Sequence, residues 1–205
     1  MSSRFVFVVG PGVHCPVFGG DALSTWTLAV PGAAGANPLR TVVFGGGRFV
    51  AVGDSGTVLM SSDGTIWSAA NPVTQKSLLS VAYGPGRFVA VGQSGTIVSS
   101  SDGVTWLAEN SVTTNRLAAV AWTDLGFVAV GDQGTILTSG DAANWTIQSS
   151  GTSSRLVGVG NGFGRTFIGA AADSRSPKPA LVNQRFKLDG WQAGLGCQSL
   201  RAIRL

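Results

Sequence analysis

The sequence is poor in charged residues and in the side chains that favour helices. Only 12% of its 205 residues are charged, and it has three lysines and one glutamate. No hydrophobic run approaches the about 20 residues that a membrane-spanning helix needs, because Gly, Pro and polar residues interrupt every apolar stretch. Glycine, by contrast, accounts for 30 residues, and 44% of the chain is hydrophobic. This composition excludes intrinsic disorder, disfavours helices and favours tight turns, so we expect one soluble all-β domain.

Residues that commonly carry chemistry are also scarce. His14 and Cys15 are adjacent, and the only other cysteine is Cys197, so no metal-binding spacing is present. The glycine clusters contain no nucleotide-binding loop and no metallohydrolase motif accompanies them. We therefore predict neither a metal nor a cofactor. Two reduced thiols are the favoured interpretation of the cysteines, and a disulfide that links the two ends of the chain stays open.

The sequence contains a repeat with a period of 39 residues. Its units open with similar segments at Leu39, Leu78, Leu117 and Leu156. A tryptophan lies 28 residues after each of the first three openings, at Trp67, Trp106 and Trp145. Short apolar runs alternate with Gly and Asp turns inside each unit, which predicts four short antiparallel strands. A repeated unit of this length and content is the pattern of a β-propeller blade.

The two ends of the chain fit the same register. Residues 4–10 match the second strand of a unit, and Asp21 and Trp26 match its final turn and strand. The last residues, 200–205, match the opening segment at Leu39, so they can supply the strand that the N-terminal unit lacks. Pairing both ends in one sheet leaves no unpaired edge. We therefore predict an all-β, five-bladed propeller in a single domain, with blades at about 1–38 plus 200–205, 39–77, 78–116, 117–155 and 156–199. The surplus residues of the last blade, 173–179, are predicted to form an exposed loop.

A short motif precedes three of the tryptophans. It reads SSDGTIW at 61–67, SSDGVTW at 100–106 and SGDAANW at 139–145. In these segments the chain resembles the Asp-box, or BNR-repeat, propellers, which include sialidases, photosystem II assembly factors and many bacterial and phage proteins. It departs from the usual box because Asp63, Asp102 and Asp141 precede their Trp by four positions instead of five. The resemblance implies a propeller whose boxes stabilise the turn between third and fourth strands, and it says little about function.

The sialidases of that family need an arginine triad, a Tyr nucleophile beside a Glu, and an Asp acid. The chain has one Tyr and one Glu, Tyr83 and Glu109. Tyr83 aligns with Phe44 and Trp122 as a repeat-position aromatic residue, and Glu109 is expected in a loop after Trp106. We therefore predict that the chain is not an enzyme.

Positive charge is concentrated in the last blade. Residues 1–154 carry six basic and eight acidic side chains, whereas residues 155–205 carry eight basic and two acidic ones. We predict a docking surface for an acidic protein partner on this blade, formed by Arg155, Arg165, Arg175, Lys178, Arg185 and Lys187. Arg116 occupies the position of Arg155 in the preceding unit, so the two can line one face. Nucleic acid is disfavoured, because the aromatic residues are not interleaved with the basic ones. A solvated basic edge without a partner is the alternative.

Two functions remain open. The first is a non-enzymatic interaction or structural assembly module, such as a virion-associated phage protein. Residues 5–9 fit the repeat and are not interpreted as a signal peptide, so a cytoplasmic or virion location is expected. The alternative is a multivalent glycan-binding lectin, with one tryptophan per blade and polar residues in the repeated turns. Those turn residues are Asp54, Gln93 and Asp132. A buried tryptophan that braces each blade is the competing interpretation.

Overall fold

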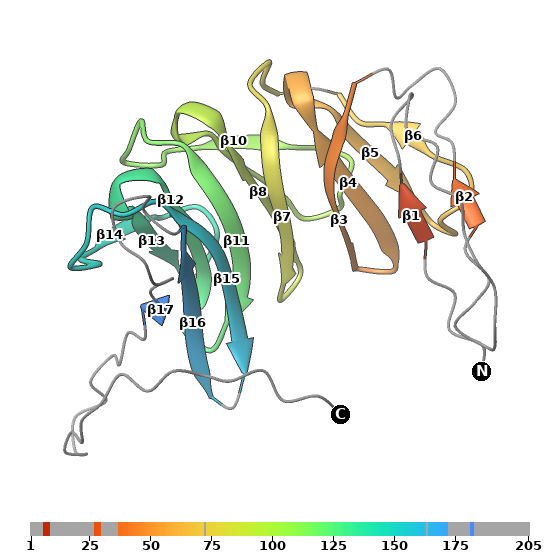
Figure 1. Cartoon of the computed structure of the whole chain (residues 1–205). Coiled ribbons are helices and arrows are strands. Elements are labelled where there is room, and N and C mark those ends of the chain that lie inside the picture. Colours follow the sequence, from red (N-terminus) through yellow and green to blue (C-terminus); the bar gives the residue numbers. More distant parts are fainter. Residues whose placement is uncertain are drawn as a thin grey trace.

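A computed structural model of the chain describes residues 37–71, 73–162 and 164–171, together with the backbone of three short strands at 6–8, 27–29 and 181–182. In this part of the chain the regular structure is β-strand, apart from three short 3-10 turns. The sheets stand side by side in a fan that follows the sequence (Figure 1). The predicted all-β architecture is confirmed. None of the described residues belongs to a helix that is long and apolar enough to cross a membrane.

Four antiparallel sheets begin at the predicted opening leucines, and we call them blades I to IV. Blade I contains β3 (Leu39–Gly45), β4 (Arg48–Gly53), β5 (Val58–Ser61) and β6 (Ser68–Ala69). Blade II contains β7 (Leu78–Gly84), β8 (Arg87–Gly92), β9 (Ile97–Ser100) and β10 (Leu107–Glu109). Blade III contains β11 (Leu117–Thr123), β12 (Gly126–Gly131), β13 (Ile136–Ser139) and β14 (Thr146–Gln148). Blade IV contains β15 (Leu156–Gly162), β16 (Arg165–Ala170) and β17 (Leu181–Val182). Strands pair in sequence order in every blade, so the predicted four-stranded unit is confirmed for blades I to III.

The N-terminal strands pair differently from the prediction. β1 (Val6–Val8) and β2 (Thr27–Ala29) form a parallel pair, whereas an antiparallel four-stranded blade was expected there. The second and fourth strands of an up-and-down sheet point in the same direction, so they can pair only in parallel when no third strand lies between them. The intervening residues 9–26, the loop at 173–179 and the closing segment at 200–205 lie outside the described residues.

The core lies between the blades. Valines of blade I, including Val50 and Val52, pack against Leu78, Val81 and Phe88 of blade II. Similar clusters join blade II to blade III and blade III to blade IV. The middle strands are apolar on both faces because each face is covered by a neighbouring blade. This two-sided burial explains why segments such as FVAVG are continuous apolar runs and do not alternate with polar residues.

The first strands of neighbouring blades also lie next to one another. The Thr41 hydroxyl in β3 accepts a hydrogen bond from the Val81 N–H in β7, and the Ser80 hydroxyl accepts one from the Val120 N–H in β11, both at 3.1 Å. Blade III carries Ala119 at the equivalent position, which offers no acceptor to blade IV. The first strands of blades I, II and III are therefore linked by a repeated hydroxyl contact that Ala119 cannot make to blade IV.

Each motif before a tryptophan forms a hydrogen-bonded turn between the third and fourth strands. In blade I, Asp63 Oδ1 accepts bonds from the N–H groups of Thr65 and Ile66, at 2.8 and 3.0 Å. Trp67 Nε1 donates to the Gly64 carbonyl at 3.1 Å. Blades II and III repeat both contacts, and all three indoles are only 5 to 7% exposed. These tryptophans brace their blades and present no open face to a sugar. Trp26 and Trp191 lie outside the described residues.

Two details of the predicted units are corrected. The fourth strands begin one residue after the tryptophan, at Ser68, Leu107 and Thr146. Glu109 lies in β10 and not in a loop, because its backbone pairs with Ile97 of β9. Outer strands of two or three residues leave little exposed edge, which limits unwanted pairing with other chains.

Candidate functional site

Polar side chains gather at one end of the blades, which we call the turn end. It contains the starts of the first strands and the 3-10 turns η1 (Asp54–Gly56), η2 (Gln93–Gly95) and η3 (Asp132–Gly134). The predicted turn residues Asp54, Gln93 and Asp132 each begin one of these turns. Their N–H groups donate to the carbonyls of Pro38, Ser77 and Arg116, at 2.9 to 3.0 Å. Each turn is thus attached to the residue that precedes the opening leucine of its own blade.

Glycine fixes the path of these turns. Gly56 ends η1 with a φ of +71°, and a Cβ atom there would lie 1.8 Å from the Thr74 carbonyl oxygen. Gly95 and Gly134 end η2 and η3 with the same conformation and the same close approach to the linker that leads to the next blade. Only glycine tolerates both the positive φ and the contact. The chain therefore presents the first residue of each turn at nearly the same place in successive blades.

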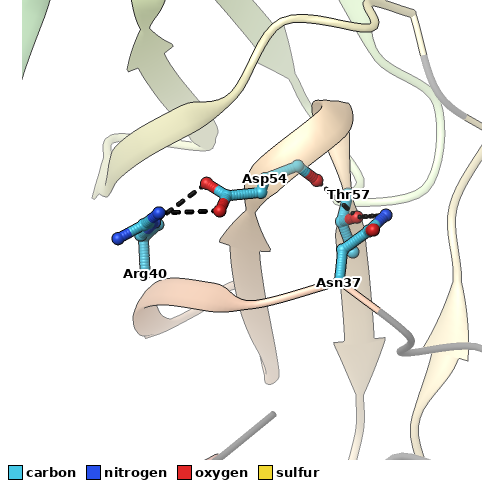
Figure 2. A network of polar contacts seen from close by, with 4 residues as sticks. All are labelled: Asn37, Arg40, Asp54 and Thr57. Atoms are coloured by element: carbon cyan, nitrogen blue, oxygen red, sulfur yellow. Dashed lines mark hydrogen bonds and ion pairs between the residues drawn. The ribbon is translucent and has the colours of Figure 1, made fainter. Parts of the chain in front are cut away.

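In blade I this residue is held by an arginine (Figure 2). Arg40 in β3 donates from Nε and Nη2 to the two carboxylate oxygens of Asp54, at 2.9 and 2.6 Å. These hydrogen bonds lower the pKa of Asp54, and Ser77 from the next blade lowers it further. The Thr57 hydroxyl donates to the Asp54 carbonyl and accepts from Asn37 Nδ2. Arg40 and Asp54 thus form a bidentate ion pair with no net charge, on a turn that other hydrogen bonds stabilise.

At the junction of blades III and IV, the positive charge is not balanced by an equal negative charge. Arg116 Nη1 lies 3.5 Å and Arg155 Nε 3.3 Å from the same oxygen of Asp132, Oδ1. Arg116 precedes β11 and Arg155 precedes β15, so the two arginines come from adjacent blades. The side chains of Arg155 and Arg116 are 54% and 31% exposed. The predicted placement of both arginines on one face agrees with this arrangement, and their shared partner Asp132 was predicted only as a turn residue.

The predicted basic surface of the last blade does not form as one patch among the described residues. Gly162 pairs with Arg165 at one end of the β15–β16 hairpin, and Leu156 pairs with Ala170 at the other. Arg155 precedes Leu156, so it lies about 20 Å from Arg165, the length of a seven-residue strand. Arg155 and Arg165 thus lie at opposite ends of the hairpin, and a docking surface on this blade stays a prediction. Arg175, Lys178, Arg185 and Lys187 lie outside the described residues.

The two ends of the described blades differ in charge. At the turn end, segments 37–40, 54–56, 76–79, 93–95, 115–118, 132–134 and 154–157 contain four basic and two acidic residues. At the opposite, hairpin end, the described residues of 45–48, 62–66, 84–87, 101–105, 123–126, 140–144 and 162–165 contain three basic and four acidic residues. With Glu109, which ends β10 on the side of η2, the turn end carries +1 and the hairpin end −1. An acidic ligand is therefore favoured at the turn end.

Residues considered for hydrolysis or metal binding are not brought together. Tyr83 lies at the end of β7, where its ring packs on Gly45 of blade I, and Glu109 accepts a hydrogen bond from the Ser99 hydroxyl at 2.6 Å in β10. β7 and β10 are the two opposite edges of blade II. The described residues contain no group of three His, Cys, Asp or Glu side chains that could hold a metal ion. His14, Cys15 and Cys197 lie outside them.

The fold of the chain is similar to that of solved propellers. No protein-family model matches the sequence, and no curated protein matches it. YCF48 bound to D1 peptide matches with a TM-score of 0.54 and 15% identity, over 72% of this chain and 54% of that chain. YCF48 from Cyanidioschyzon merolae matches with a TM-score of 0.49 and 21% identity, over 71% and 56%. An ancestral GH74 enzyme matches with a TM-score of 0.46 and 14% identity, over 71% and 26%. The chain thus spans about half the length of the YCF48 chains, and the first likeness shows a β-propeller fold.

Proposed function

We propose that the chain is a non-enzymatic protein-interaction module that docks an acidic segment of a partner at its turn end. The observation that carries this proposal is the cluster of Arg116, Asp132 and Arg155. Two guanidinium groups share one carboxylate oxygen there, so the cluster keeps a net positive charge and unused N–H donors. A planar guanidinium recognises carboxylates through paired hydrogen bonds. The shared contact with Asp132 places both guanidinium groups on the same surface.

The fold likeness supports binding of a peptide by such a scaffold. YCF48, the propeller that the chain resembles with a TM-score of 0.54, was solved with a bound D1 peptide. Loops and turns at one end of a rigid set of blades are a common place for binding residues, because the scaffold fixes their positions. In this chain the repeated turns and the starts of the first strands provide that end.

The proposed module is a closed ring of five blades of the Asp-box type. A closed ring is supported by the exposure of the faces of blades I and IV that have no described blade beside them. These faces are more exposed than the equivalent faces that pack against a neighbouring blade. Val42 in blade I is 41% exposed, whereas Val81 at the same position of blade II is 7% exposed. Phe167 in blade IV is 38% exposed, whereas Val50 at the same position of blade I is fully buried. A blade built from residues 1–38 and 200–205 would cover both faces.

The docking proposal is tested with a fluorescent peptide of alternating Glu and Gly residues and its Gln counterpart. The double variant Arg116→Ser and Arg155→Ser removes the cluster, and serine is the residue that blade II carries at this position, Ser77. We expect fluorescence anisotropy to show that the acidic peptide binds and that the variant binds it about tenfold more weakly or worse. The matched control, Arg48→Ser with Arg87→Ser, removes two arginines from the hairpin end.

Equal weakening in both double variants would mean that the peptide responds to overall charge, and equal binding of the Gln peptide would mean that carboxylates are not recognised. Either result contradicts the proposal. We further propose a structural role in a phage virion, in line with the phage proteins among the propellers that its boxes resemble. Mass spectrometry of purified particles should then find the chain in fixed stoichiometry. The alternative function, a multivalent lectin, predicts glycan-array binding that is lost when Asp54, Gln93 and Asp132 are replaced.

A further inference from the structure

A cavity of about 300 Å³ opens between blades I and II, at their outer rim. It lies between the end of the outer strand β6 and the box turn of the next blade. Its lining residues are Ala69, Ala70, Asn71, Val73, Val104, Thr105 and Trp106. None of them belongs to the turn-end cluster. This volume is at the lower end of the range that small-molecule sites occupy.

A small residue at one repeat position leaves this space open. Ala70 follows β6, and the equivalent residues of blades II and III are Glu109 and Gln148. Both longer side chains are held on their own blade, since Glu109 bonds to the Ser99 hydroxyl at 2.6 Å and Gln148 Nε2 to the Thr138 hydroxyl at 3.0 Å. Ala70 packs in the same cluster as Trp106 and is 7% exposed. Ala70 carries only a methyl group, so no side chain from this position extends over the space beside Trp106.

The lining favours a ligand that is uncharged and has both polar and apolar faces. Val73 and Val104, each 39% exposed, supply aliphatic surface, and the largely buried Trp106 is also among the lining residues. Asn71 offers an amide that can donate and accept, and Thr105 offers a hydroxyl. Among the described residues, no charged side chain lines the cavity, so they offer no partner to an ionic ligand that gives up its hydration. A pyranose ring combines an apolar C–H face with hydroxyl groups and meets these conditions.

We propose that this inter-blade cavity is a binding site for one neutral sugar ring of a glycan. The sugar would lay its C–H face on Val73 and Val104, and its hydroxyls would bond to the Asn71 amide and the Thr105 hydroxyl. The site is distinct from the turn end and does not depend on acidic-partner docking. It also differs from sugar binding in the repeated turns, because it uses a feature that blade I does not share with blades II and III.

The test is a titration of the protein with the methyl pyranosides of glucose, galactose, mannose and N-acetylglucosamine. Binding is followed by saturation-transfer NMR and by the indole N–H signal of Trp106, which is assigned with a Trp106→Phe variant. Ala70→Gln places a longer side chain beside the cavity, and blade I carries Met60 where blade III has the Thr138 hydroxyl that holds Gln148, so the new side chain is free to enter the cavity. We expect at least one glycoside to bind saturably and Ala70→Gln to weaken it about tenfold or more. Gln148→Ala, at the equivalent position of blade III, is the matched control and should leave this binding unchanged.

A second pair of variants identifies the ligand class. Asn71→Ala and Thr105→Val remove hydrogen-bonding groups and retain the apolar lining, so they should weaken the glycoside and spare N-acetyl-leucine amide, an uncharged aliphatic probe. If no glycoside binds saturably, or if Ala70→Gln binds it as the wild type does, the site is refuted. Binding of the leucine probe alone would refute the sugar assignment. Neither result would affect peptide docking at Arg116 and Arg155, so the two proposals fail separately.

Discussion

At the scale of single residues, the box aspartates act as fixed acceptors for their own turns. Asp102 Oδ1 accepts the N–H groups of Thr105 and Val104, both at 2.8 Å, and these bonds lower the pKa of Asp102 from 3.8 to about 2. Hydrogen bonds from Thr65 and from Asn144 hold the pKa of Asp63 and Asp141 well below the ordinary value. A group whose pKa is lower in the folded state stabilises the fold while it is ionised. That contribution is complete above the unfolded pKa and is lost as the pH falls through the folded pKa.

Stability should therefore respond to acid in a defined window. The free energy of unfolding in urea is expected to stay nearly constant from pH 7 to about 5 and to fall between about pH 4 and 2, where the carboxylates gain protons. The triple variant Asp63→Asn, Asp102→Asn and Asp141→Asn keeps an oxygen acceptor in each turn that does not titrate in this range. It should fold at pH 7 and lose clearly less stability in acid. An identical acid loss in the variant and the wild type would contradict this role of the boxes.

At the scale of elements, the positions of the strands could be predicted, but which strands pair with each other could be predicted only in part. The repeated apolar runs and Gly turns placed β3 to β5 and their equivalents, because two-sided burial and tight turns leave a strong local signal. The parallel pairing of β1 with β2 was not predicted. A repeat pattern predicts the direction of each strand, but it does not tell which strand lies beside it. The loop prediction for Glu109 failed because its pairing depends on β9 and not on its own propensity. Ala142 has a positive φ of +68°, close to the +78° of Gly64 and the +72° of Gly103 in the other boxes, which composition alone does not indicate.

The hydroxyl links between first strands allow a matched test. Ser80→Ala removes the acceptor for the Val120 N–H and should lower the free energy of unfolding by about 1 kcal/mol. Ala119→Ser places a hydroxyl at the same repeat position, facing Val159 of blade IV, and should raise stability by about 0.5 kcal/mol. Urea unfolding measures both effects, and amide hydrogen exchange at Val120 and Val159 assigns them to the links. The double variant measures the coupling between the two links, because they meet at the adjacent residues Ala119 and Val120 of β11. If Ala119→Ser slows amide exchange neither at Val120 nor at Val159, a hydroxyl at this repeat position does not create the link in another blade.

At the scale of the whole molecule, the parts of the candidate site that follow from the spacing of the repeats could be predicted. Arg116 and Arg155 are exactly one period apart and were expected on one face, and η1, η2 and η3 confirm the repeated turns. Arg40 was not singled out, although its place directly after an opening leucine put it at the same end. That Arg155 and Arg165 lie at opposite ends of a hairpin could not be predicted, because charge along the sequence does not tell which end of a hairpin a residue occupies. Asp132 was predicted as a turn residue. Its contact with arginines of two blades could not be predicted, because it depends on how those blades are placed relative to each other.

Ring closure is the remaining prediction at this scale, and Val42 can report on it. In a ring, Val42 is covered as Val81 is in blade II, so Val42→Ser should lower the free energy of unfolding by about 1 to 2 kcal/mol. Ile147, which is 65% exposed in the outer strand β14, is the control, and Ile147→Ser should change stability little. Deletion of residues 200–205 should cost more than either substitution, because it removes a strand and exposes sheet edges on both sides. Thermal unfolding of the three variants decides the matter. If the deletion and Val42→Ser both leave the transition unchanged, residues 200–205 do not close the ring, and the open faces of blades I and IV must have another cover.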